Sequence, residues 1–337
     1  METKLLRRVS LHRLMDLKVD YAFKQLFGTE KNKAITVVFL NAILRRSGRD
    51  SIQDVSFKNN ENSGEYEGDK QSRLDILALT NNQEWVNIEI QFTNQYDMIK
   101  RSLYYWAGIY RYPMKKGMGY RQLTPAIAIT IMNFSLFDQT DRFHTSYHLY
   151  EDTEQFKLTD MMEFHFLEMP KLMSKWKANK LDPWNDALAR WMLLLGIVDH
   201  RQGHVYEDIY QELEEIAMKD DVLKTAFQGW DQLSATEEEV LAYEARLKQV
   251  LDEEAAKREA ELREQEALQK GLEQGKREGE RERLIRSTVN FLEARFPEED
   301  KGTILERLNA MTDIEELDQR QKEVFRAESW AEVKRIL

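Results

Sequence analysis

The sequence predicts an α/β protein, α+β in its order of elements, with a mixed central sheet flanked by helices and a helical C-terminal region. Three observations support this fold class. Short apolar runs with the length and alternation of β-strands are confined to residues 52–169. Runs with helical periodicity precede these strands and separate two of them. Beyond Pro170 the apolar pattern is helical.

The elements of the first half can be placed in order. Val19, Phe23 and Leu26 recur at helical spacing and predict a helix over 16–27. The elements expected after it are a helix at 35–44, a strand at 52–57, a polar loop at 58–70, a hairpin of strands 73–80 and 85–93, a helix at 94–115, and strands at 125–132, 143–150 and 163–169. Because 125–132 is almost continuously apolar, we expect that strand to be buried on both faces.

The second half is divided by composition. Helices are expected at 184–198, 206–218 and 220–230, then a charged segment at 236–283, and helical periodicity again at 284–296, 304–308 and 324–337. These patterns predict four parts: a mixed α/β domain (1–170), a helical extension (171–235), a charged helical linker (236–283) and a small helical domain (284–337). Apolar positions in the linker form a poor heptad stripe, so a solvated helix is favoured over a weak, oligomer-forming coiled coil.

The overall composition excludes several classes of protein and site. The chain has 337 residues, enough for more than one domain, and 32% charged residues, which indicates a long solvated segment. It has no cysteine, which excludes disulfides, thiolate metal sites and cysteine nucleophiles. We find no secretory signal and no apolar run of about 18 residues, so we expect a cytoplasmic protein without a membrane partner.

A basic, aromatic segment contrasts with the net charge of −11. Residues 100–121 contain six cations, no acid and six Tyr or Trp residues. Such interleaving suits a phosphate backbone and its bases. An equally good interpretation is a helix whose aromatic residues pack in the core and whose cations are solvated.

Two acids face each other across the predicted hairpin. If the hairpin is symmetric about Asn82, Asp75 lies opposite Glu89, and Gln91 shares their face. Asp75 also shares a face with Leu77 and Leu79, so this face is expected to be covered. Like charges that are opposite and partly buried need compensation. A divalent cation such as Mg²⁺ or Mn²⁺, or a cation such as Lys70 or Arg73, could provide it.

Several motifs in order give a family resemblance. The segments DYAFKQLFG, EKNKAITVVFLNAIL, SRLDILALT, NIEIQF and KRSLYYWAGIYR resemble the Rpn group of recombination-promoting nucleases and transposases, within the PD-(D/E)XK nuclease superfamily. The resemblance covers about residues 14–140 and implies a helix, a three-stranded antiparallel meander, another helix and a further strand. It also implies DNA as a partner and a role in recombination or mobile-element biology.

The resemblance assigns roles residue by residue. Asp75 and Glu89 match the acids that hold the metal ion, with the carbonyl of Ile90 as a further ligand. Asp20, on the first helix, matches an acid that can approach the metal. Gln91 stands where many relatives have lysine; it can orient water or a phosphate oxygen but cannot act as a general base. Residues expected to contact the substrate are Lys70, Arg73, Lys100, Arg101, Tyr104 and Tyr105.

Three hypotheses follow from these observations. The leading one is an Mg²⁺-dependent endonuclease that hydrolyses phosphodiester bonds in DNA. The second is a catalytically weak or inactive DNA-binding or regulatory module on the same fold. The third is an interaction protein that forms homo-oligomers through its helical tail. Two histidines four apart, such as His144 and His148, could be metal ligands on a helix. On a strand they are more often surface or packing residues, and His144, His148 and His165 are interpreted in this way.

Overall fold

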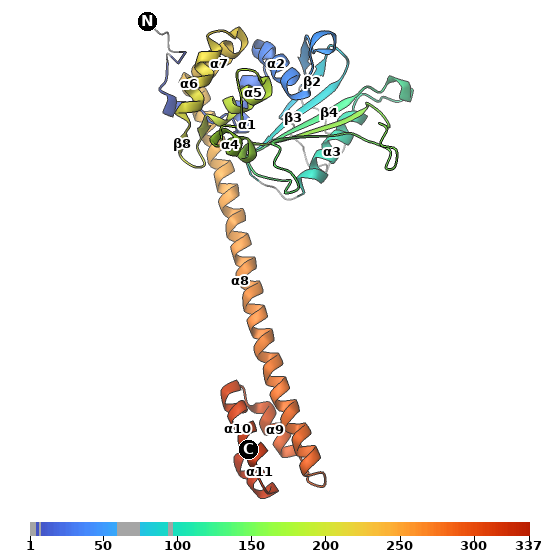
Figure 1. Ribbon diagram of the computed structural model, residues 1–337, viewed down its shortest axis with the longest axis vertical. Coiled ribbons are helices and arrows are strands. Elements are labelled where there is room, and N and C mark those ends of the chain that lie inside the picture. The colour runs from blue at the N-terminus through green and yellow to red at the C-terminus, as the bar shows by residue number, and fades with distance from the viewer. Residues whose placement is uncertain (1–4, 7, 59–74, 94–96) are drawn as a thin grey trace. The chain divides into compact units, whose positions relative to one another are not determined.

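The computed structural model describes residues 5–6, 8–58, 75–93 and 97–337 (Figure 1). The strands are β1 (Val55–Phe57), β2 (Ile76–Thr80), β3 (Trp85–Gln91), β4 (Ala126–Met132), β5 (His144–Tyr147), β6 (Met162–Glu168), β7 (Val198–Asp199) and β8 (His204–Val205). The α-helices are α1 (Asp20–Phe27), α2 (Lys33–Leu44), α3 (Met98–Arg111), α4 (Met169–Lys177), α5 (Ala187–Gly196), α6 (Glu207–Ala217), α7 (Asp221–Ala235), α8 (Glu237–Arg295), α9 (Gly302–Ala310), α10 (Ile314–Arg326) and α11 (Trp330–Ile336).

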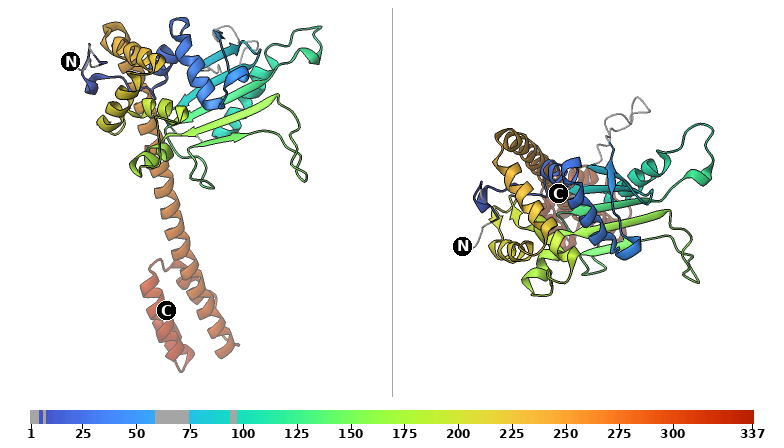
Figure 2. Two further views of the ribbon diagram at one scale, coloured as in Figure 1. Left: turned by 45° about the horizontal axis from the view of Figure 1, so that its top comes forward. Right: turned by 90° about the horizontal axis from the view of Figure 1, so that it is seen from above.

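Six strands form one mixed sheet in the order β1-β2-β3-β4-β6-β5. Strands β1, β2 and β3 form an antiparallel meander, β3, β4 and β6 run parallel, and β5 pairs antiparallel with β6 at the edge. Figure 2 shows this sheet from two further directions. The order helix, meander, helix, parallel strand confirms the fold that the sequence predicted.

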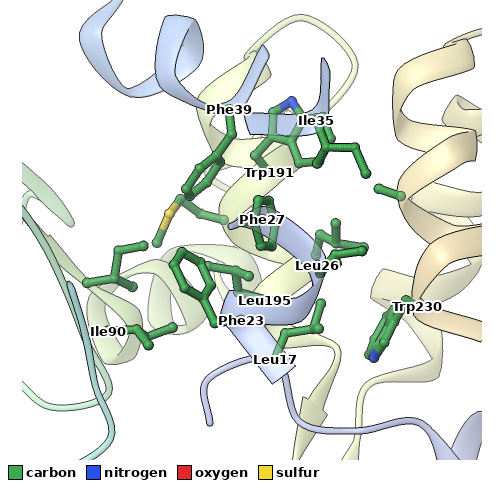
Figure 3. Close-up of a cluster of buried hydrophobic side chains, with 14 of the residues drawn as sticks. Leu17, Phe23, Leu26, Phe27, Ile35, Phe39, Ile90, Trp191, Leu195 and Trp230 are labelled. Carbon is green, nitrogen blue, oxygen red and sulfur yellow. The ribbon is translucent and has the colours of Figure 1, made fainter. Parts of the chain in front are cut away.

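The two faces of the sheet are covered by different helices. Apolar side chains of β3 and β4 such as Ile88 and Ile129 join the main core with α1, α2, α5 and α7, where Phe27, Phe39 and Trp191 are fully buried (Figure 3). The opposite face packs against α3 through Leu77, Trp85, Trp106 and Ile109. Strand β4 is buried along its whole length, as its apolar run predicted.

The helices that follow the sheet share its core. Residues of α5, α6 and α7 lie in the same hydrophobic cluster as α1, α2 and β3, so 171–235 is part of one compact unit with the α/β region. That unit comprises Met1–Glu254. It therefore includes the first turns of α8, where the sequence analysis had placed the start of a solvated linker at 236.

Helix α8 continues through the charged segment to Arg295. None of the side chains from 251 to 283 is buried, in agreement with a solvated helix. The second compact unit, Ala255–Leu337, has its own core, formed by the end of α8 with α9, α10 and α11. Helix α4 and the short β7–β8 pair had no counterpart in the sequence analysis.

Candidate active site

The β2–β3 hairpin has the predicted register. Ile76 pairs with Ile88 and Leu79 with Trp85, so the pairs are centred on Asn82. Continued by one residue, this register brings Asp75 opposite Glu89, where β2 begins. Because side chains alternate along a strand, both acids lie on the face that α3 covers, together with the buried Leu77.

Asp75 is held by two groups from different elements. Its Oδ2 accepts a hydrogen bond from the backbone N–H of Ile90 at 2.8 Å. Its Oδ1 lies 3.2 Å from Nζ of Lys24, on the last turn of α1. The carboxylate is largely buried, with 8% of the side chain exposed. Lys24 therefore provides the compensation for which the sequence analysis had considered Lys70 and Arg73; both of those lie outside the described residues.

Glu89 is more deeply buried and more loosely held. Its side chain lies 3.7 Å from Nε of Arg101 on α3. Asn87 and Gln91, its neighbours on the same face of β3, donate hydrogen bonds of 3.4 and 3.3 Å to its two oxygens. The carbonyl oxygen of the Asn87 side chain has no hydrogen-bond partner among the described residues, although it is buried. The polar groups around Glu89 are thus incompletely paired.

The electrostatics of the two acids reflect this environment. Burial raises the pKa of Asp75, although Lys24 and the N–H of Ile90 oppose the shift. Burial, and then the charge of Asp75, raise the pKa of Glu89 to about 8, with Arg101 acting in the opposite direction. The local cations therefore do not fully compensate two charged carboxylates, and a further positive charge at this place would be stabilising.

A cleft of about 470 Å³ opens beside these residues. Asp75, Ile90 and Gln91 line it from the hairpin, Asp20 and Lys24 from α1, Arg101 from α3, and Arg246, Gln249, Val250 and Glu253 from α8. Asp20 does not contact Asp75. Both oxygens of Asp20 instead accept hydrogen bonds from Nε of Arg246, at 2.8 and 2.9 Å.

The basic and aromatic residues of α3 lie in two environments: some pack against the sheet, and others face the cleft or the solvent. Trp106 packs on the sheet and donates a hydrogen bond to the carbonyl of Ala126, so part of the aromatic set is core. Arg101 lies 5.1 Å above the ring of Tyr105 and faces the cleft. Lys100 and Tyr104 are exposed, and Lys100 pairs with Asp97. Some aromatic residues of the 100–121 segment therefore pack in the core and others are exposed, while contact of this segment with a phosphate backbone stays a prediction.

The described residues contain no cluster of three or more Asp, Glu, His or Cys side chains close enough to hold a metal ion. Two carboxylates, Asp75 and Glu89, are nevertheless a suitable set for Mg²⁺, which takes one or two carboxylates and keeps several waters. The pKa values of both acids are raised, and the side-chain oxygen of Asn87 is buried without a hydrogen-bond partner among the described residues. Both features are expected of a site whose negative charge a cation would balance. The residues present thus fit a hard divalent ion.

The histidines lie away from this cleft, at the β5–β6 edge. His144 and His165 share a hydrogen bond of 2.8 Å, and the other ring nitrogen of His165 bonds Glu163 at 2.7 Å. His148 lies 3.7 Å from the same carboxylate. This arrangement agrees with the packing role that the sequence analysis favoured.

Two contributions to the cleft were not predicted. Lys24 was noted only as part of a motif, although its position four residues after Asp20 places both on one side of α1. Arg246 gave no sequence signal, because it lies in a segment where charged residues predominate. Tyr243 and Val250, three residues before and four after it, do form an apolar stripe at helical spacing, which could have indicated a packed face.

The sheet and its paired acids define the class of protein as a nuclease-like α/β fold. The family model of the PD-(D/E)XK nuclease family transposases matches residues 17–260. The chain belongs to this family. No curated protein and no solved structure matches the chain. Among the described residues, no helix is long and apolar enough to cross a membrane.

Proposed function

We propose that this protein is a metal-dependent endonuclease that hydrolyses phosphodiester bonds in DNA. The observation that carries the proposal is the pair of buried acids, Asp75 and Glu89, whose charges are incompletely compensated beside a cleft that contains Lys24 and Arg101. Membership of a nuclease and transposase family supports DNA as the substrate and a role in recombination or mobile elements.

Asp75 and Glu89 are the residues we propose to hold Mg²⁺ or Mn²⁺, with the carbonyl of Ile90 as a further ligand. Asp20, held by Arg246, is proposed as the helix acid that can approach the ion. A bound ion of this kind activates water and stabilises the charge that develops on a phosphodiester. Its affinity depends on the ionised form of both acids, so protons compete with the metal.

The chain's own residues have three tasks in this proposal. Lys24 and Arg101 line the cleft as cations and attract the phosphate backbone. Gln91 positions water or a phosphate oxygen through its amide, since an amide does not take up a proton at neutral pH. Lys100 and Tyr104, which are exposed on α3, and Tyr105, which lies beside Arg101, are proposed to extend the contact to the backbone and bases. Lys70 and Arg73 are proposed for the same task.

The test is nicking of supercoiled plasmid DNA by the full-length protein across a series of divalent metals. We expect nicking in Mg²⁺ or Mn²⁺, none in EDTA, and none with Asp75→Asn or Glu89→Gln. Lys157→Ala serves as a control, because Lys157 pairs with Asp160 away from the cleft. Binding of DNA without cleavage in every metal would contradict the proposal.

Two observations favour a second function, a DNA-binding or regulatory module that does not cleave. Gln91 occupies the position where many proteins of this superfamily have lysine, and Asp20 is already engaged by Arg246. The two functions differ in the plasmid assay, since only the endonuclease converts supercoiled DNA to the nicked form.

A further inference from the structure

The first turns of α8 are fixed to the α/β region by specific contacts. Tyr243 is 3% exposed, and its hydroxyl accepts a hydrogen bond from the backbone N–H of Asp16 at 2.9 Å. The same hydroxyl lies 2.7 Å from Nδ1 of His200. One turn earlier, Glu239 accepts a hydrogen bond of 2.6 Å from Tyr21. These contacts set the rotation of the helix about its axis.

Arg246 follows Tyr243 by three residues and therefore lies on the same face of α8. This places its side chain at the cleft wall, about one-third exposed, beside Asp20. Only Nε is used for Asp20. Among the described residues, neither terminal nitrogen of the guanidinium has a hydrogen-bond partner, so its four terminal N–H donors remain available to the cleft.

We propose that Arg246 binds a phosphate group of the nucleic-acid substrate, which makes α8 a wall of the active site. The inference deepens the proposed endonuclease function and rests on it. A guanidinium matches the geometry of two phosphate oxygens with two parallel N–H donors, which an ammonium does not. The bond from Nε to Asp20 fixes the plane of the group, so little side-chain entropy is lost when a phosphate binds.

Cations from three helices line the cleft in which a phosphate would meet Arg246. Lys24, Arg101 and Arg246 approach from three different helices. The facing acids are Asp20 and Asp75, with Glu253 one further turn along α8. Asp75 is paired with Lys24, and Asp20 with Nε of Arg246, so the terminal nitrogens of Arg246 are left for a ligand in the cleft.

Three full-length variants test the inference: Arg246→Ala, Arg246→Lys and Lys248→Ala. Lys248 is exposed on the same helix, two residues from Arg246, and does not line the cleft. For each variant, kcat and KM for nicking are measured, together with the melting temperature. Binding of a short duplex is measured over a salt series in the Asp75→Asn background, where cleavage is absent.

We expect Arg246→Ala to raise KM about tenfold and to reduce the salt slope of log K by about 1, as for the loss of one phosphate contact. Arg246→Lys should keep the salt slope but recover only part of the affinity. Lys248→Ala should match wild type in KM and in slope. If Arg246 only neutralises Asp20, Arg246→Ala should change the melting temperature. Its KM for nicking and its salt slope should then equal those of the Lys248→Ala protein.

The outcomes separate this inference from the function on which it rests. If the wild type nicks DNA and Arg246→Ala has an unchanged KM and salt slope, Arg246 is no substrate contact while the endonuclease proposal stands. If the wild type neither nicks nor binds DNA in any metal, the endonuclease proposal fails and the role of Arg246 fails with it.

Discussion

At the scale of single residues, a buried carboxylate is tolerated as an anion only where other groups replace its lost hydration. Asp75 has Lys24 at 3.2 Å and a backbone N–H at 2.8 Å. Glu89 has its nearest cation, Arg101, at 3.7 Å, and its pKa is raised to about 8. Of these two acids, Glu89 has the more distant cation and the longer hydrogen bonds.

This imbalance predicts opposite effects of Glu89→Gln on stability and on activity. In EDTA at pH 8 the variant should melt at least as high as wild type, because an undercompensated buried charge has been removed. Its nicking rate with Mg²⁺ should fall at least about 100-fold, since metal-based charge stabilisation amounts to several kcal/mol. Melting curves and plasmid nicking on one preparation measure both effects.

Glu84→Gln is the matched control for that substitution. Glu84 is paired with both terminal nitrogens of Arg46, so its charge is compensated within the protein. Loss of this pair should destabilise the fold by roughly 1.5–3 kcal/mol, the range for hydrogen bonds to charged groups, and leave kcat for nicking unchanged. Destabilisation of Glu89→Gln to the same degree would show that Glu89 is a structural ion-pair residue.

The histidine pair at the sheet edge predicts a dependence of stability on pH. Burial, followed by the nearby charges of His165 and Arg45, lowers the pKa of His144 to about 4, while Glu163 opposes the shift. Between pH 6.5 and about 4 the unfolded chain binds a proton that folded His144 does not, so this contribution to stability is lost as the pH falls through that window.

Replacement of His144 by Phe keeps a ring against His165 but removes the ionisable group. We expect the free energy of unfolding of His144→Phe to fall less steeply between pH 6.5 and 4 than that of wild type, as followed by denaturant unfolding at several pH values. Parallel slopes for the two proteins in this window would exclude His144 as the source. The slope would then originate at other histidines whose pKa is lowered by burial, such as His148 or His200.

At the scale of elements, α8 is the least expected contributor to the site. Its hydrophobic pattern averages out over 59 residues, because one helix passes from a packed segment into a solvated one. The hydrogen bond that anchors it joins residues 16 and 243, which no local pattern connects. The composition therefore predicts a charged helix correctly, but it does not show at which residue α8 stops packing against the first unit.

The hairpin was predictable for the converse reason. A two-residue period fixes which side chains share a face, and a short turn fixes the register, so Asp75 and Glu89 could be paired from sequence alone. The contacts of Lys24 and Arg101 depend on how α1 and α3 approach the sheet. That approach is set by side chains such as Phe23 and Ile109, whose partners lie far away in the chain.

The anchor of α8 can be tested with Tyr243→Phe. The substitution keeps the ring but leaves the buried N–H of Asp16 without its acceptor, which should destabilise the protein by about 1–3 kcal/mol. We expect a lower melting temperature and, because Arg246 then loses its fixed position, a higher KM for nicking. Tyr112→Phe, which alters an exposed hydroxyl, serves as the control and should match wild type in both measurements.

At the scale of the whole molecule, the main core of the first compact unit and the core of the second share no residue. The boundary between its two compact units falls between Glu254 and Ala255, within α8 and close to residue 260, where the family match ends. From 252 to 283 no side chain is buried and none packs against either of these two cores. Each unit is thus expected to fold without the other.

This expectation distinguishes two truncations that differ by 19 residues. A chain that ends at Glu254 keeps Tyr243, Arg246 and Val250; it should unfold cooperatively and nick plasmid DNA with the KM of the full-length protein. A chain that ends at Ala235 loses all three. Removal of the buried Val250 side chain alone costs about 1.5–3 kcal/mol, so the shorter chain should melt lower and nick with a raised KM. Circular dichroism and the plasmid assay are carried out on both fragments. Equal stability and equal KM of the two fragments would mean that α8 contributes nothing to the first unit. If the fragment that ends at Glu254 does not fold, part of the core of the first unit lies beyond residue 254.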